Sequence, residues 1–191
     1  MSTRIQLKNV RISYPYLFEP NTGPSGKDNP RYTAEFLIPK TDEAQLDLVE
    51  GAIEAAIDQK WKGKRPSKLT DERLFLLDGD ELGKENTEGH WVVRAASRIR
   101  PTVVNKDRTP LTAADGVIYG GCRVNAIIEA WGQDNEYGVR VNAELKGVQF
   151  ANDDVSFGGG GTPVRPEDFE DTTNEPAEDE PPKRASRFRR G

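Results

Sequence analysis

Cysteine and histidine are almost absent from this 191-residue sequence, which has one residue of each, Cys122 and His90. A single cysteine excludes an internal disulfide and is typical of a protein in a reducing cytoplasm. Structural zinc sites usually need four nitrogen or sulfur ligands, so these two residues also argue against a zinc site. We therefore expect a cytoplasmic protein with no metal and no cofactor.

Long hydrophobic runs are also missing. No stretch approaches the roughly 20 apolar residues of a membrane-spanning helix, and residues 1–9 lack the layout of a signal peptide. Hydrophobic residues make up 35% of the chain, and the mean hydropathy of −0.74 is low for a compact globule. These values predict one domain, at residues 1–155, followed by a disordered tail at residues 156–191.

The usual signatures of catalysis are missing as well. The sequence has no GxSxG motif, and its single cysteine lies inside a predicted strand. The glycine-rich link at residues 157–163 precedes an acidic run and lacks the lysine of a P-loop, and no dinucleotide-binding fingerprint is present. The sequence therefore predicts a protein that is not an enzyme.

Charge is distributed unevenly along the chain, whose net charge is −5. The predicted tail holds an acidic run of eight carboxylates, which are Glu167, Asp168, Glu170, Asp171, Glu175, Glu178, Asp179 and Glu180. Five bases follow this run, which are Lys183, Arg184, Arg187, Arg189 and Arg190. Residues 1–164 keep 21 bases and 24 acids, so any contact with nucleic acid must come from a local stripe of cations.

The stretch from Trp91 to Arg100 alternates with the two-residue period of a strand. One face, which includes Trp91 and Ile99, is predicted to point inward. The other face carries Arg94, Arg98 and Arg100 without an acid. Guanidinium groups spaced along a strand suit a row of phosphates, because each can chelate oxygens or lie flat on a base. The alternative is that these arginines pair with acids on a neighbouring strand.

Several further segments alternate in the same way. A first strand runs to Tyr14 with a bulge near Asn9, and the loop that follows exposes Tyr16 and Phe18 at its start. Residues 31–38 form a second strand. Residues 122–131 and 137–145 form a β-hairpin, whose outer face carries Arg123, Trp131 and Arg140 and whose inner face includes Tyr137.

Residues 42–61 show helical spacing of apolar side chains and begin with a good N-cap, so they predict one amphipathic helix inserted between strands. Its end runs into Lys62, Lys64 and Arg65. These cations suit a phosphate site, although the helix dipole alone also favours cations at this end. The order of elements predicts a mainly β fold, a small antiparallel β-barrel with one helix.

Acidic residues Asp78, Asp80 and Glu81 occupy a turn after a short apolar run. A pair of aspartates can hold a divalent metal, so a metal-dependent nuclease is the enzymatic alternative. Such pairs are also common in surface turns.

Basic and aromatic side chains on the same strands are what a sequence-tolerant binder of single strands uses, with cations following phosphates and ring faces stacking on bases. The residues that we predict to contact DNA are Arg94, Arg98, Arg100, Lys62, Lys64, Arg65, Arg123, Arg140, Trp131, Tyr16 and Phe18.

Four segments carry a family resemblance, which are VRISYPYLFEP (residues 10–20), RYTAEFLIPK (31–40), GHWVVRAASRIRPTVVN (89–105) and YGGCRVNAIIEAW (119–131). In this order they resemble a family of bacteriophage single-stranded-DNA-binding proteins, over roughly residues 3–170. The resemblance implies an OB-fold that coats single-stranded DNA without sequence preference during phage replication and recombination in the host cytoplasm. The sequence leaves duplex DNA open as a weaker partner, and a homo-oligomer is compatible with it.

Single-strand binders of this kind commonly end in an acidic tail that docks replication partners and competes with DNA. The residues that resemble such an element are Glu167, Asp168, Phe169, Glu170 and Asp171. Phage or host replication and recombination proteins are the partners that this resemblance implies. The basic residues that follow depart from the pattern, so a solubilising tail and a tail-driven protein-interaction module stay as alternatives.

Overall fold

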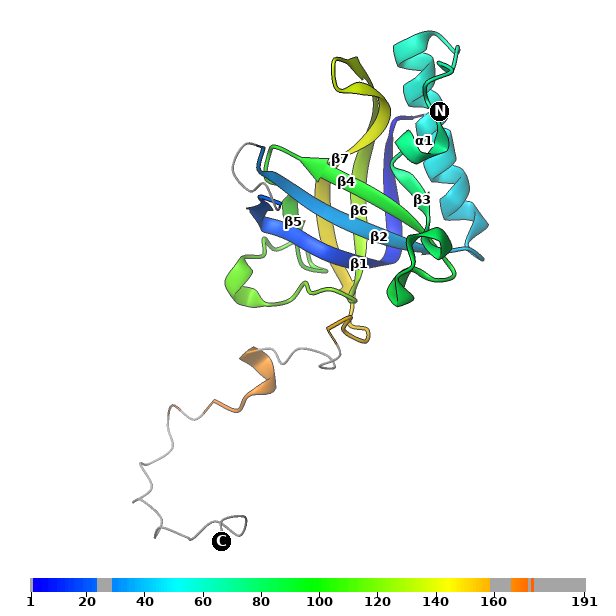
Figure 1. Ribbon diagram of the computed structural model, residues 1–191. Coiled ribbons are helices and arrows are strands. Elements are labelled where there is room, and N and C mark those ends of the chain that lie inside the picture. The colour runs from blue at the N-terminus through cyan, green and yellow to red at the C-terminus, as the bar shows by residue number, and fades with distance from the viewer. Residues whose placement is uncertain (1, 24–28, 159–165, 172, 174–191) are drawn as a thin grey trace, which may run out of the picture.

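The computed structural model describes residues 2–23, 29–158, 166–171 and 173 (Figure 1). Its main elements are β1 (Arg4–Asn21), β2 (Arg31–Pro39), α1 (Glu43–Trp61), β3 (Leu76–Asp78), β4 (His90–Ser97), β5 (Thr102–Val104), β6 (Arg123–Asn135) and β7 (Gly138–Asn152). Single-turn 3₁₀ helices lie at Asp71–Arg73, Gly79–Leu82, Glu85–Thr87, Ala113–Asp115 and Pro166–Asp168. The predicted mainly β, OB-fold-like barrel with one inserted helix is confirmed. Most of the predicted disordered tail lies outside the described residues.

The barrel is closed by a pairing that the sequence did not predict. Strands β4, β2, β1, β6 and β7 are hydrogen-bonded in this order, and β4 also pairs with β7, which completes the ring. This last pairing is parallel, with Ala95 opposite Ala143 and Ala96 opposite Glu144. The pairings around the rest of the ring are antiparallel, as expected. β3 and β5 extend the sheet at its two edges.

Helix α1 covers one end of the barrel and packs mainly on β6 (Figure 1). The N-cap residue Asp42 accepts a hydrogen bond from the Gln45 backbone N–H, and the residue after the helix, Lys62, takes the left-handed conformation. At its end the helix crosses Gly132 of β6, where an added Cβ would lie 2.6 Å from Cβ of Lys60. Only glycine allows this close approach, so the helix end is fixed against the β6–β7 hairpin.

Strand β1 has three register irregularities, of which the sequence predicted the one near Asn9. The register with β6 slips between Leu7 and Val10, and Asn9 has a φ of 52°, so the expected bulge is confirmed. The register with β2 slips again after Ser13, where Tyr14 has a φ of 48°. This second bulge changes which side chains point outward.

The strand therefore continues well past the expected loop start. Tyr16 and Phe18 lie in β1 rather than in a loop, which corrects the prediction. Tyr16 is exposed, whereas Phe18 is half-buried and packs against the core. The strand continues because Tyr16 and Asn21 still pair with Thr33 and Arg31 of β2, and Leu17 between them is buried.

Strand β4 ends at Ser97, earlier than the alternation predicted. The Ser97 hydroxyl accepts a hydrogen bond from the Ile99 backbone N–H at 3.0 Å, which turns the chain locally. Arg100 also precedes Pro101, which restricts its backbone. Ile99 is 74% exposed, so its predicted inward position is wrong.

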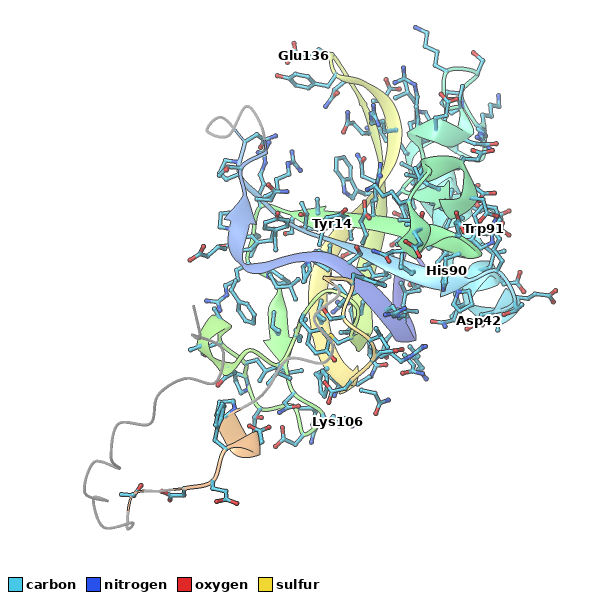
Figure 2. All side chains as sticks on the ribbon, turned by 60° about the horizontal axis from the view of Figure 1, so that its bottom comes forward. Tyr14, Asp42, His90, Trp91, Lys106 and Glu136 are labelled. Carbon is cyan, nitrogen blue, oxygen red and sulfur yellow. The ribbon has the colours of Figure 1, made fainter. Side chains whose placement is uncertain are left out.

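The β6–β7 hairpin is confirmed and projects beyond the barrel, with Glu136 at its tip and Lys106 at the opposite end of the barrel (Figure 2). Both strands are longer than predicted, so the turn consists only of Glu136 and Tyr137. Tyr137 is 78% exposed because it lies in this turn, which makes its predicted inward position wrong. Trp91 is half-buried against the core, which is close to the predicted position.

The first residues of the predicted tail pack on the barrel. The Phe157 backbone N–H donates to Gly120 O at 2.9 Å, and the Arg11 guanidinium lies 4.2 Å from the centre of the Phe157 ring. The packed body therefore extends at least to Phe157. Among the described residues, no helix is long and apolar enough to cross a membrane.

Candidate nucleic-acid interface

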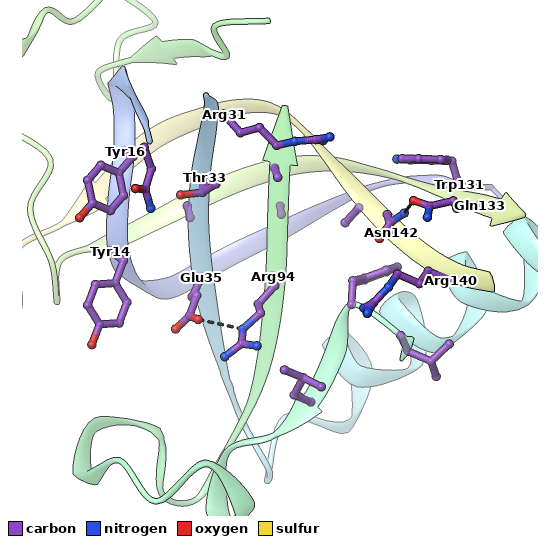
Figure 3. Close-up of a pocket in the computed structure, with 18 of the residues that line it drawn as sticks. Tyr14, Tyr16, Arg31, Thr33, Glu35, Arg94, Trp131, Gln133, Arg140 and Asn142 are labelled. Atoms are coloured by element: carbon purple, nitrogen blue, oxygen red, sulfur yellow. Dashed lines mark hydrogen bonds and ion pairs between the residues drawn. The ribbon is translucent and has the colours of Figure 1, made fainter. Parts of the chain in front are cut away.

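A groove of about 610 Å³ crosses the outer faces of β1, β2 and β4 and ends on the β6–β7 hairpin (Figure 3). We call it the aromatic–arginine groove. The side chains that line it include Tyr14, Tyr16, Arg31, Glu35, Glu72, Leu74, Leu77, Lys84, Arg94, Trp131, Gln133, Arg140 and Asn142. These residues come from strands that are far apart in sequence, and the barrel closure brings them together.

Three exposed aromatic rings lie at the two ends of this groove. Tyr14 and Tyr16 stand side by side on β1, and Trp131 lies across the groove on β6 (Figure 3). Their exposed fractions are 54%, 42% and 42%. Exposed rings of this size offer flat faces on which bases stack. The predicted outward positions of Trp131 and Tyr16 are confirmed.

Four cations line the groove between and beside these rings: Arg31, Lys84, Arg94 and Arg140. Glu35 and Glu72 are the acids in the lining, so the groove has two more positive than negative charges in a chain whose net charge is −5. This local excess of positive charge is the kind of cationic stripe that an acidic chain needs in order to contact nucleic acid.

Arg94 combines the two roles that the sequence suggested for the arginine face, which are pairing with an acid on a neighbouring strand and contact with a ligand. It lies directly opposite Glu35 across the β2–β4 pairing, and its Nε donates to Glu35 Oε1 at 2.9 Å. The Glu35 side chain is only 14% exposed, so it fixes the guanidinium at the groove floor. Within the described part of the chain, neither Nη group of Arg94 makes a hydrogen bond, so both can donate to a ligand.

The other arginines of that stretch lie outside the groove. Arg98 and Arg100 follow the end of β4, and the Arg100 guanidinium lies 5.5 Å from the centre of the Phe18 ring. Arg123 lies at the start of β6, far along the strand from Trp131. Its Nε donates to Asp154 Oδ2 at 2.8 Å and its Nη1 to Asn9 O at 3.1 Å, so it joins strands rather than facing the groove.

The basic end of α1 is also outside the groove lining. Lys62 and Lys64 are exposed beside the helix end. Arg65 donates twice to Leu69 O and once to Asp71, at 2.7 Å, so it closes the loop after the helix. The structure thus brings Arg94, Arg140, Tyr16 and Trp131 of the predicted set together in one groove.

Sequence reasoning missed three groove residues, Arg31, Tyr14 and Lys84. Arg31 shares the outer face of β2 with Glu35, so its two-residue spacing was a usable signal. Tyr14 is turned outward by the second bulge, which alternation alone does not reveal. Lys84 comes from a loop, and its Nζ lies 4.9 Å from the centre of the Tyr14 ring.

The acidic turn proposed for a metal is neutralised by a lysine. Lys40 Nζ lies 2.6 Å from Asp78 Oδ1 and 2.6 Å from Asp80 Oδ2. Glu81 lines a separate groove beside α1. No three histidine, cysteine, aspartate or glutamate side chains converge as a metal site in the part of the chain that the structure describes.

The ion pairs of Lys40 with Asp78 and Asp80 predict that the stability of the fold depends on pH. The hydrogen bond from Lys40 lowers the pKa of both Asp78 and Asp80 below the usual 3.8. The stabilisation is therefore present above pH 3.8 and is lost as pH falls through the lowered pKa values. Lys40→Met should lower the free energy of unfolding at pH 7 but change it less at about pH 2.5, measured by urea denaturation. Lys64→Met, at an exposed lysine without a partner among the described residues, should show no such difference.

The chain is similar to proteins of bacteriophages. A family model described as Enterobacter phage Enc34, ssDNA-binding protein, matches residues 3–180. Protein p50 of Acyrthosiphon pisum secondary endosymbiont phage 1 is 39% identical over 174 residues, which cover 88% of this chain and 93% of that protein.

Solved structures agree with this family match. The single-stranded DNA-binding protein from bacteriophage Enc34, in complex with ssDNA, is 36% identical with a TM-score of 0.72, covering 81% of this chain and 89% of that one. The single-stranded DNA-binding protein gp2.5 of bacteriophage T7 is 16% identical with a TM-score of 0.52, covering 92% and 98%, which supports the fold alone. The chain belongs to the Enc34 ssDNA-binding protein family of bacteriophages.

Proposed function

We propose that this protein binds single-stranded DNA, without sequence preference, in the aromatic–arginine groove. The observation that carries this proposal is the placement of three exposed rings and four cations on one continuous face. The Enc34 relative whose structure contains ssDNA matches this chain over most of its length, which supports the same ligand here.

The groove supplies the two interactions that single strands offer. Arg94 and Arg140 contact phosphates, and Trp131, Tyr14 and Tyr16 stack on bases. Two of the groove amides already bond each other, since Asn142 Nδ2 donates to Gln133 Oε1 at 3.0 Å. They are therefore poorly placed to read base edges, so the binding does not depend on sequence. Duplex DNA binds more weakly because its base faces are already stacked.

The biological role that fits this binding is the protection of single-stranded DNA during phage replication and recombination in the host cytoplasm. The protein acts as a binder and not as a nuclease, since Lys40 neutralises Asp78 and Asp80, the aspartates on which the nuclease alternative depended. The acidic run provides the contact with replication or recombination proteins. Phe169 is 71% exposed among these acids, which suits a docking anchor.

Removing the groove arginines should weaken the salt dependence of binding. We expect Arg94→Ala with Arg140→Ala to lower the slope of log K against log salt by about 1.4, because each phosphate contact on a single strand contributes about 0.7. Glu35→Gln is added so that no unpaired carboxylate remains at the groove floor. The measurement is the quenching of tryptophan fluorescence by an oligo-dT strand at several salt concentrations.

A matched control distinguishes this face from the arginines at the end of β4. Arg98→Ala with Arg100→Ala removes two arginines outside the groove, as the groove variant removes two inside it, and should leave the slope almost unchanged. If this control lowers the slope and the groove variant does not, the DNA follows the end of β4 instead.

A further inference from the structure

A second groove, of about 580 Å³, lies between helix α1 and the segment that leads into β3. We call it the α1–β3 groove. Figure 1 shows β3 between β4 and α1, so this groove opens on the helix side of the barrel. The stretch around Glu72, Leu74 and Leu77 lines both grooves and forms the wall between them.

The α1–β3 groove has an apolar floor. Ile53 and Ile57 come from α1, Leu76 from β3 and Trp91 from β4. Leu76 and Trp91 are only half-buried, so part of this apolar surface faces solvent. A groove of this kind gains free energy when an apolar side chain fills it.

Carboxylates surround this floor. The acids in the lining are Glu50, Glu54, Asp71, Glu72, Asp78 and Glu81, against Arg65 alone. Asp78 is paired with Lys40 and Asp71 with Arg65. The other four make no ion pair or side-chain hydrogen bond with any described residue. These carboxylates repel the phosphates of nucleic acid. They attract a cationic ligand, and the apolar floor favours one that also carries an apolar group.

The same chain contains a segment with this chemistry. Residues 183–190, the basic segment, hold five bases and no acid, with Phe188 between Arg187 and Arg189. The family model ends at residue 180, so this segment lies beyond the part that the family shares. Phe188 suits the apolar floor, and the arginines suit the free carboxylates around it.

The chain is long enough for this contact. About 25 residues separate Phe157, on the barrel, from Lys183, and they can span up to about 80 Å. A domain of about 155 residues is only about 40 Å across. A linker of this length gives an effective concentration near the millimolar range, so a weak contact is already occupied within one molecule.

We propose that the α1–β3 groove binds the basic segment of the same chain. The contact needs no DNA, so it can be tested separately from the proposed function. It also holds five cations away from phosphates, which leaves DNA binding to the aromatic–arginine groove.

Paramagnetic broadening in the full-length chain tests this proposal. Gly191→Cys introduces one accessible thiol for a nitroxide label, while Cys122 is fully buried and stays unlabelled. In the absence of DNA, we expect the indole N–H resonance of Trp91 to lose most of its intensity and that of Trp131 to lose less. The loss should disappear at about 1 M salt, where the Debye length falls to about 3 Å.

Two sets of charge variants make the test specific. Glu50→Gln, Glu54→Gln and Glu81→Gln together remove three exposed charges of the groove and should restore the Trp91 intensity. Glu85→Gln, Glu88→Gln and Glu136→Gln remove the same charge from exposed positions outside it and should leave the broadening in place. Unchanged chemical shifts in the barrel core verify that each variant folds.

Three outcomes would overturn the proposal. One is an unbroadened Trp91 at low salt in the labelled full-length chain. Another is broadening that persists in the groove variant or is stronger at Trp131. The last is broadening seen only between molecules, in a mixture of spin-labelled chains with separate isotope-labelled chains, which would assign the groove to the basic segment of a second copy.

Discussion

Replacing Trp131 with alanine should weaken the binding of single-stranded DNA by about 5- to 150-fold, because a stacked base contributes about 1–3 kcal/mol. Adding Tyr16→Ala should weaken it further by a similar factor, since the two rings lie at opposite ends of the groove (Figure 3). Neither change should alter the melting temperature much, because both side chains are 42% exposed on the outer face. Trp131 is itself a fluorophore, so the measurement is the anisotropy of a labelled oligo-dT strand.

The hairpin provides a matched control for this prediction. Tyr137 is more exposed than Trp131 and lies on the same hairpin, but in the turn and outside the groove lining. Tyr137→Ala should therefore leave the affinity unchanged, and Trp131→Phe should retain most of it because a ring remains. If Tyr137→Ala weakened binding while Trp131→Ala did not, the DNA would pass over the hairpin tip instead.

The alternation of polar and apolar residues correctly predicted which groove side chains point outward from regular strands. Trp131 and Arg140 were placed on outer faces from their two-residue spacing, and the hairpin register confirms this because Trp131 pairs with Asn142. Arg94 was placed correctly for the same reason. Its partner Glu35 was not predicted, because the spacing on one strand does not reveal what lies opposite it on another.

Local interruptions of the strands account for the residues that the sequence misplaced. The second bulge in β1 turns Tyr14 outward, and the Ser97 hydroxyl ends β4 before Arg98. The first depends on a left-handed backbone conformation and the second on one side-chain hydroxyl, and a hydrophobic pattern contains neither. The parallel pairing of β4 with β7 joins residues far apart in the chain, so it also has no signature in the sequence.

Net charge was a poor guide to the ligand of this chain. The whole chain is acidic, yet the wall around Glu72 separates a groove with excess positive charge from one with excess negative charge. Interactions with phosphates act over about one Debye length, roughly 10 Å at 0.1 M salt, so the local lining matters more than the total. The acidic net charge of this chain is therefore not a reason to exclude nucleic acid as its ligand.

Gly79→Ala should be the most destabilising single-methyl change near the groove, by about 3 kcal/mol, because it forces atoms into a packed backbone. An added Cβ would lie 2.1 Å from Thr87 O and 2.5 Å from His90 O. The same contact is held by the Thr87 hydroxyl, which donates to Gly79 O at 2.8 Å in a buried position. If these backbone segments are forced apart, the loop that holds Lys84 at the aromatic–arginine groove is displaced.

We therefore expect Gly79→Ala to lower the melting temperature by roughly 6–12 °C, for a domain in which 1 kcal/mol corresponds to about 2–4 °C. Affinity for single-stranded DNA, measured well below that temperature, should also fall, because Lys84 no longer lies beside the Tyr14 ring. Gly120→Ala is the control, since a Cβ there meets no atom within 4 Å and its φ is not left-handed. Equal stability of the two variants would mean that the loop from Gly79 to His90 shifts freely and does not hold Lys84 in place.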